Sequence, residues 1–124
     1  MPDGEAAAKP LRWVGDSRKQ LRKFPEPVKD EMGQALWLAQ QGNKHRSAKP
    51  LKGFKGAGVL EIVGDFDGDT YRAVYTVRLK SAVYVLHCFQ KKSKQGAATP
   101  KADIDLIVER LGAAARLDRE SRMT

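Results

Sequence analysis

Apolar residues recur at helical spacing in two segments of this chain. Between Pro27 and Gly42 they return at steps of three and four residues, which places side chains along one face of a helix. These residues are Val28, Met32, Ala35, Leu36 and Ala39. A second helix is predicted from Thr99-Pro100, with Thr99 as its cap and Pro100 at its first helical position. The expected buried stripe of this helix comprises Ile104, Ile107, Val108 and Leu111.

The region between these helices has the pattern of strands. Val59–Asp65 and Thr70–Leu79 are separated by Phe66-Asp67-Gly68-Asp69, a sequence typical of a hairpin turn. The second of these strands is expected to show Tyr71, Ala73, Tyr75, Val77 and Leu79 on one face. Ala82–Gln90 is apolar on both faces, which indicates a central, covered strand. The residues expected to share one face of that strand are Val83, Val85, His87 and Phe89.

Two short elements precede the first long helix. Leu11–Val14 is predicted to be a strand, and Asp16 or Ser17 is suited to cap a short helix that ends at Lys23. The segment Lys44–Gly58 is predicted to be a loop, because proline and glycine punctuate a run of basic residues.

These elements predict an α+β fold. A small antiparallel sheet, a meander, is expected to pack against two N-terminal helices and one C-terminal helix. The 124 residues, 41% of them hydrophobic, suit a single domain over residues 1–124. Residues 1–9 and 117–124 are expected to be flexible.

The distribution of charge favours a nucleic-acid partner. The chain has a formal net charge of +8 at pH 7. No Asp or Glu occurs between Glu31 and Glu61, and none occurs between Asp69 and Asp103. Surfaces normally mix both signs, whereas an excess of positive charge attracts polyanions. We therefore favour a nucleic-acid partner over a merely soluble basic protein.

Several classes of protein are disfavoured. No apolar run is long enough to cross a bilayer, and the N-terminal residues lack the pattern of a secretory signal, so we expect a cytoplasmic protein that does not bind membranes. The lone Cys88 excludes an internal disulfide and is expected to be a small buried strand residue. Only His45 and His87 are present, and no carboxylate has ligand-like spacing to either. We therefore expect no metal site and no small-molecule cofactor.

Metal-free chemistry on RNA remains. The 2′-hydroxyl of RNA can attack the neighbouring phosphorus, so a protein need only position the chain, stabilise negative charge and move protons. Arginine and lysine suit the stabilisation of charge. The candidate cations are Lys52, Lys55, Arg72, Lys91 and Lys92. We expect Arg72 and the Lys91–Lys92 pair to meet at one edge or face of the meander.

Four further residues need an interpretation: two have both a functional and a structural one, and two have a structural one alone. Tyr75 is a candidate for base stacking or proton relay, and equally a core aromatic. His87 is a candidate for proton transfer, although a structural role is favoured. Trp13 and Trp37 are expected to lie in the core.

Five short sequences occur here in an order that resembles a known family. They are Leu51-Lys52-Gly53-Phe54, Val59-Leu60-Glu61-Ile62, Tyr71-Arg72-Ala73-Val74-Tyr75, the run from Val83 to Ser93, and the Thr99-Pro100 helix with Ile104, Ile107 and Arg110-Leu111. Over roughly residues 10–115 the chain is similar to the phage-derived Gp49-like group of HigB-type toxins, in the RelE/ParE toxin superfamily.

The resemblance implies a compact toxin of a type II toxin–antitoxin system that cleaves mRNA, typically on the ribosome, without metal. The implied partner is a helix-turn-helix antitoxin that covers the toxin. Arg72 matches the arginine that contacts the scissile phosphate, and Lys91 and Lys92 match the basic pair after the last strand. Lys52 and Lys55 match the basic loop, and we group Lys94 with them as RNA-binding.

One departure leaves the proton-transfer groups open. RelE toxins have a tyrosine in or near the last helix, but this chain has no tyrosine after Tyr84. Lys91, Lys92, His87 and Tyr75 remain the candidates, and a lysine could act as a base only if its pKa were lowered by burial or neighbouring charge. Two other functions remain open: a ParE-like inhibitor of a protein such as DNA gyrase, and a module that binds RNA or a partner but has lost catalysis.

Overall fold

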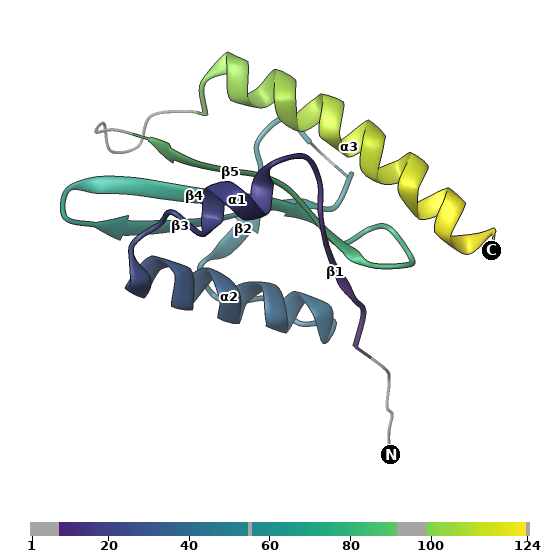
Figure 1. The fold of residues 1–124 in the computed structure, drawn as a ribbon, viewed down its shortest axis with the longest axis horizontal. Coiled ribbons are helices and arrows are strands. Elements are labelled where there is room, and N and C mark those ends of the chain that lie inside the picture. Colours follow the sequence, from purple (N-terminus) through teal and green to yellow (C-terminus); the bar gives the residue numbers. More distant parts are fainter. Residues whose placement is uncertain (1–7, 55, 92–98, 124) are drawn as a thin grey trace.

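The computed structural model describes residues 8–54, 56–91 and 99–123, which form one sheet with helices on both of its faces (Figure 1). The helices are α1 (Ser17–Leu21), α2 (Glu26–Gln40) and α3 (Lys101–Arg122). The strands are β1 (Leu11–Trp13), β2 (Ala48–Pro50), β3 (Val59–Phe66), β4 (Asp69–Thr76) and β5 (Val83–Lys91). Their order across the sheet is β1-β5-β4-β3-β2. The α+β prediction is confirmed.

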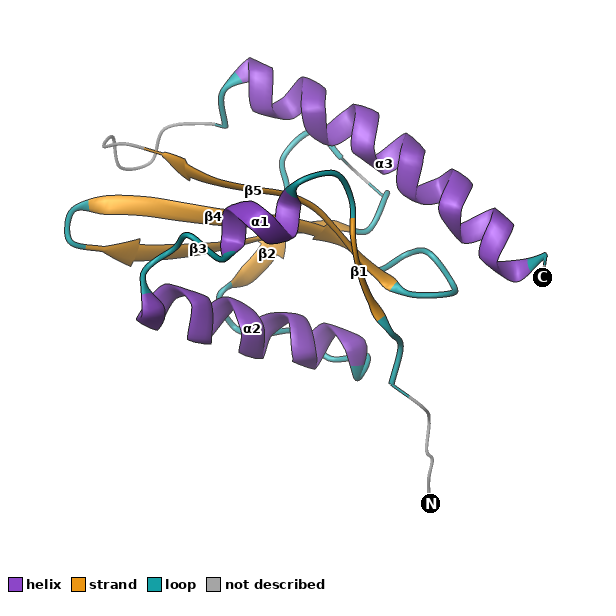
Figure 2. Cartoon of the chain, viewed as in Figure 1, coloured by secondary structure: helices purple, strands orange, loops and turns teal. Residues whose placement is uncertain are grey.

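The two faces of the sheet carry separate apolar clusters. Helix α2 and the chain just before it pack on one face, where Val28 and Met32 meet Ile62 and Tyr71. Helix α3 packs on the other, where Ile107 lies in a cluster with strand residues. Figure 2 shows the sheet between these layers. Strand β5 is buried from Val83 to Cys88, which confirms the prediction of a covered strand.

The edges of the sheet differ from the prediction. Strand β1 pairs with β5 in parallel, so the sheet is mixed and not a purely antiparallel meander. Strand β2 lies within the segment predicted to be a loop and pairs with β3. It was missed because it has only three residues, and its exposed Lys49 and Pro50 are typical of a short edge strand.

A bulge in β5 changes which face His87 occupies. Val74 of β4 pairs with His87, but the next residue, Tyr75, pairs with Val85, so Leu86 is an extra residue. The prediction that His87 and Phe89 share a face with Val83 and Val85 is therefore wrong. Val83 and Val85 pack on the α2 side, whereas His87 and Phe89 lie on the α3 side.

Two apolar residues expected to be buried are exposed. The side chain of Trp37 is 58% exposed and that of Val108 is 55% exposed. Each directly follows a buried residue of its helix, Leu36 or Ile107, and the helical turn carries it away from the sheet. Trp13 is only partly buried and packs against the cluster on the α2 side.

The ends of α3 also depart from the prediction. Pro100, not Thr99, takes the N-cap position, and no side chain caps the helix there. The C-terminal end is helical as far as Arg122, although we expected residues 117–124 to be flexible. None of the helices that the structure describes is long and apolar enough to cross a membrane.

Asp118 anchors the last turns of α3 to the loop between β4 and β5. Its carboxylate accepts hydrogen bonds from the Ser81 backbone at 2.7 Å and from the Ser81 hydroxyl, and it pairs with Arg122 at 3.2 Å. Burial alone would raise the pKa of Asp118. The hydrogen bonds from Ser81 and Lys80, with the charge of Arg122, outweigh burial and hold the pKa below its ordinary value.

We predict that Asp118→Ala lowers the free energy of unfolding by about 1–3 kcal/mol, because the partly buried donors of Ser81 lose their acceptor. Urea unfolding followed by circular dichroism measures the change. Asp105→Ala is the matched control, since its carboxylate is exposed and pairs with Lys101 within the same helix. A loss for the control as large as that for Asp118→Ala would contradict the anchoring role.

The same carboxylate makes stability depend on pH. Because the folded state lowers the pKa of Asp118, the stabilisation is complete above the unfolded pKa of about 3.9 and is lost as the pH falls through the folded value. We therefore expect the difference in stability between the wild type and Asp118→Asn to be constant near neutral pH and to shrink below about pH 4. Thermal melts at a series of pH values measure this difference.

Candidate functional site

Three neighbouring strands place polar side chains on the face of the sheet that α3 partly covers. Glu61 of β3 and His87 of β5 both lie opposite Val74 of β4, one on each side. Arg72 lies two residues before Val74 and so projects from the same face. Residues 26 positions apart in sequence are thus brought into one row, at the end of the sheet where α3 begins.

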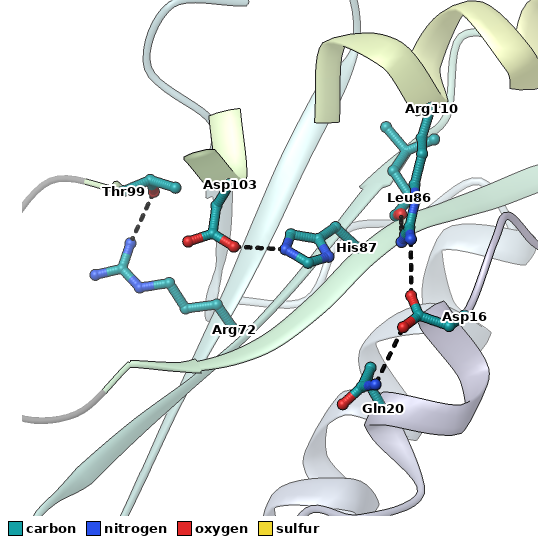
Figure 3. Close-up of polar contacts among 8 residues, drawn as sticks. All are labelled: Asp16, Gln20, Arg72, Leu86, His87, Thr99, Asp103 and Arg110. Carbon is teal, nitrogen blue, oxygen red and sulfur yellow. Dashed lines mark hydrogen bonds and ion pairs between the residues drawn. The ribbon is translucent and has the colours of Figure 1, made fainter. Parts of the chain in front are cut away.

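Arg72 forms a buried ion pair with Glu61. Its Nη1 atom donates to the Glu61 carboxylate at 2.9 Å, and the two residues are 8% and 5% exposed. The same Nη1 atom lies 3.5 Å from the Thr99 hydroxyl, the longest contact in the cluster (Figure 3). Thr99, expected to cap α3, instead contacts Arg72. The guanidinium is held in one orientation by a charge-assisted hydrogen bond.

His87 joins the sheet to the first turn of α3. Its Nε2 atom lies 2.7 Å from the Asp103 carboxylate (Figure 3). The imidazole is 7% exposed and stacks on Phe89, with ring centroids 4.8 Å apart. Its Nδ1 atom is buried and has no hydrogen-bond partner among the described residues. The Asp103 contact therefore fixes the ring and leaves one nitrogen for a further partner.

The basic residues predicted for the site divide into three groups. Lys91 lies opposite Thr70, two positions beyond Phe89, which pairs with Arg72. It is therefore a diagonal neighbour of Arg72 on the same face, with Cβ atoms about 7–8 Å apart. Lys52 is exposed in the loop between β2 and β3. Lys55, Lys92 and Lys94 lie outside the described residues, so the expected meeting of Arg72 with the basic pair is described for Lys91 alone.

Tyr75 is not brought together with these residues. It projects from the opposite face of the sheet, into the cluster beneath α2, and is fully buried. Burial raises the pKa of its phenol to about 12. Of the two roles open to it, the structure gives Tyr75 that of a core aromatic.

Sequence reasoning missed three residues of this region. Glu61 and Asp103 were noted as limits of the stretches without acids but not as site residues, because their partners depend on strand register and on where α3 begins. Lys49 lies on β2 opposite Glu61, on the same face and exposed. Alternation of side chains along β3 would have identified Glu61 had the register with β4 been known.

A second polar cluster fixes the middle of α3. Arg110 donates to the Leu86 carbonyl at 2.9 Å and to the Asp16 carboxylate at 2.7 Å, and Gln20 donates to the same carboxylate (Figure 3). The bonds from Arg110, then from Gln20, lower the pKa of Asp16. Since Leu86 is the bulge residue next to His87, this cluster holds the strand beside the site.

Cys88 takes no part in the site. The residue is buried in a strand, as predicted, and lies in the cluster on the α2 side, where burial raises the pKa of its thiol to about 12. In the part of the chain that the structure describes, no three His, Cys, Asp or Glu side chains gather as ligands for a metal ion.

The site thus combines an oriented guanidinium, a carboxylate and an imidazole. A guanidinium stabilises negative charge on phosphate or carboxylate groups. A carboxylate and an imidazole on either side of it can remove a proton from one atom and deliver a proton to another. This set of groups suits the transfer of a phosphoryl centre between two oxygens.

Comparison with known proteins gives one family and one structural neighbour. The family of phage-derived Gp49-like proteins matches residues 19–112 of the chain. No curated protein matches it in sequence. A chain from the crystal structure of the toxin–antitoxin complex RelBE2 of Mycobacterium tuberculosis is 19% identical, with a TM-score of 0.42. The similarity covers 72% of this chain and 98% of that chain.

We predict that Glu61→Ala destabilises the protein by about 3–5 kcal/mol, because the buried Arg72 charge loses its partner. Removal of both charges in Glu61→Leu with Arg72→Met should recover most of this loss, since two apolar side chains can fill the same space. Urea unfolding of the single and double variants measures both effects. A double variant less stable than Glu61→Ala would contradict the view that the loss arises because the Arg72 charge no longer has the Glu61 carboxylate beside it.

Proposed function

Because this chain belongs to the family of phage-derived Gp49-like proteins, we propose that it is the toxin of a toxin–antitoxin pair and a metal-independent endoribonuclease. Its substrate is mRNA on the ribosome, in the cytoplasm, and its partner is a helix-turn-helix antitoxin. The observation that carries the catalytic part is the grouping of Arg72, Glu61 and His87 on one face of the sheet. These are the three kinds of group that RNA cleavage by the substrate's own 2′-hydroxyl requires.

Each group has one step to perform. The Glu61 carboxylate takes the proton of the 2′-hydroxyl as the oxygen of that hydroxyl bonds to phosphorus. Protonated His87 gives its proton to the departing 5′-oxygen, so the bond to that oxygen breaks without leaving an alkoxide. Arg72 stabilises the negative charge on the phosphate oxygens between these two events. The products are a 2′,3′-cyclic phosphate and a 5′-hydroxyl.

Asp103 and Thr99 prepare the site for this reaction. Asp103 orients the imidazole through the 2.7 Å contact with Nε2. Thr99 offers Arg72 a hydroxyl oxygen at 3.5 Å. A phosphate oxygen would make a shorter, charge-assisted bond at the same guanidinium and would displace that hydroxyl.

The lysines around this centre recruit RNA. Lys49 and Lys52 are exposed and Lys91 is partly exposed, whereas Arg72, Glu61 and His87 are buried. Exposed cations attract the RNA backbone from a distance, without regard to sequence. The buried groups then act on the one phosphate that reaches them.

We predict that Arg72→Lys abolishes most cleavage while the protein still folds. Lysine keeps the charge opposite Glu61 but lacks the planar fork that bonds two phosphate oxygens, so the rate should fall about 100-fold or more. Primer extension on transcripts from cells that express each variant measures the loss of new 5′ ends. Lys19→Gln on α1 is the control, since Lys19 is exposed and takes part in none of the contacts described for the site.

Two single variants, His87→Asn and Glu61→Gln, test the proton-transfer groups. Both substitutions keep a polar side chain of similar size, and each should lower the rate of cleavage about 100-fold or more at neutral pH. Rates are measured with purified toxin on ribosomes that carry mRNA.

Growth arrest in the Arg72→Lys variant with intact transcripts and damaged DNA would overturn the nuclease function and point to inhibition of DNA gyrase.

A further inference from the structure

A groove of about 520 Å³ opens beside the site, between the β2–β3 loop and the start of β3. Its lining includes Leu51, Lys52, Phe54, Val59 and Arg78. Phe54 is partly buried, with its inner side against the cluster beneath α3. The groove is therefore a mainly apolar hollow with an aromatic ring in its wall and two cations at its rim.

The structure pairs neither of these two cations with an acid among the residues that it describes. No acidic side chain lines the groove, since its residues fall within the two stretches of sequence that contain no Asp or Glu. Among the described residues, neither Lys52 nor Arg78 has a carboxylate partner within ion-pair distance. The groove is thus complementary in charge to an anionic ligand.

Gly58 allows Arg78 to lie along this groove. The backbone of Gly58 has φ +67°, and a Cβ atom there would lie 2.1 Å from Cγ of Arg78. Any other residue would push the arginine stem away. The glycine thus lets the stem of Arg78 pass close to the loop, so that Arg78 lines the same groove as Lys52 although the two residues are far apart in sequence.

The groove lies close to the catalytic cluster. Val59, in its wall, and Glu61, the partner of Arg72, are two residues apart on the same face of β3. Two residues of a strand span about 6.6 Å. A chain bound at Arg72 could therefore continue into the groove without a long gap.

We propose that this groove binds a nucleotide of the RNA strand next to the one that is cleaved. Its base lies against the Phe54 ring, and its phosphate lies between Lys52 and Arg78. The proposal rests on the nuclease function, and it adds a site that selects and positions the strand. Stacking on an aromatic ring with cations on the backbone is the general way in which proteins hold single-stranded RNA.

The test measures binding of a short fluorescent 2′-O-methyl RNA, which cannot be cleaved, by fluorescence anisotropy over a series of salt concentrations. We expect Phe54→Leu, which keeps an apolar side chain in the core, to weaken binding about tenfold through loss of stacking. We expect Lys52→Gln with Arg78→Gln to weaken binding about tenfold or more and to reduce the dependence of log K on log salt by about 0.7 for each lost phosphate contact. Lys19→Gln should bind as the wild type does.

The outcomes separate the groove from the nuclease. The proposal that the groove binds a nucleotide would be overturned if all groove variants bound RNA with the affinity and salt dependence of the wild type. It would also be overturned if the wild type bound no RNA. Cleavage of ribosomal mRNA by the wild type, measured alongside, decides the nuclease function independently. If the protein binds RNA through the groove but leaves ribosomal mRNA intact, the binding site is confirmed and the proposed nuclease reaction is contradicted.

Discussion

The burial of Arg72 beside Glu61 is the constraint on which the rest of this structure depends. A guanidinium that is 8% exposed needs a fixed partner, because an unpaired charge there would cost several kcal/mol. The pair requires β3 and β4 to hold one register, since a slip of one residue would send Glu61 to the opposite face. It also determines the chemistry, because a paired arginine is oriented but partly neutralised. An anion must then compete with Glu61 and Thr99 for the guanidinium.

The elements of the fold could be predicted from sequence where the signal is local. Helix α2 and strands β3 and β5 follow from the spacing of apolar residues, and they appear close to the predicted limits. The parallel pairing of β1 with β5 could not be predicted, because it joins segments about 70 residues apart and leaves no local pattern. The bulge in β5 is similar: nothing between Val85 and Cys88 marks Leu86 as the extra residue. That bulge alone decides the face on which His87 lies.

The candidate site was predicted only in part for the same reason. Arg72, His87 and the lysines were identified from residue type and family resemblance, which do not depend on contacts. Their partners, Glu61 and Asp103, depend on cross-strand register and on the position of α3. Tyr75 is a case in which residue type left two roles open and the position in the sheet decides between them. Its residue type suits base stacking or proton transfer, but its place on the α2 face removes it from the site.

The positions of the acids connect the sequence pattern to the site. Glu61 ends the first stretch without acids, and Asp103 ends the second. In the fold, these two carboxylates are the ones that pair with Arg72 and His87. These carboxylates thus pair with buried partners, whereas Lys52 and Arg78 have no carboxylate partner within the part of the chain that the structure describes. An exposed cation acts on a polyanion at a range of about 10 Å in about 0.1 M salt, whereas a buried pair acts only on contact. An RNA strand that is attracted by the surface charge therefore meets groups whose geometry is already fixed. The residues that attract the RNA are thus different from the residues that select the phosphate.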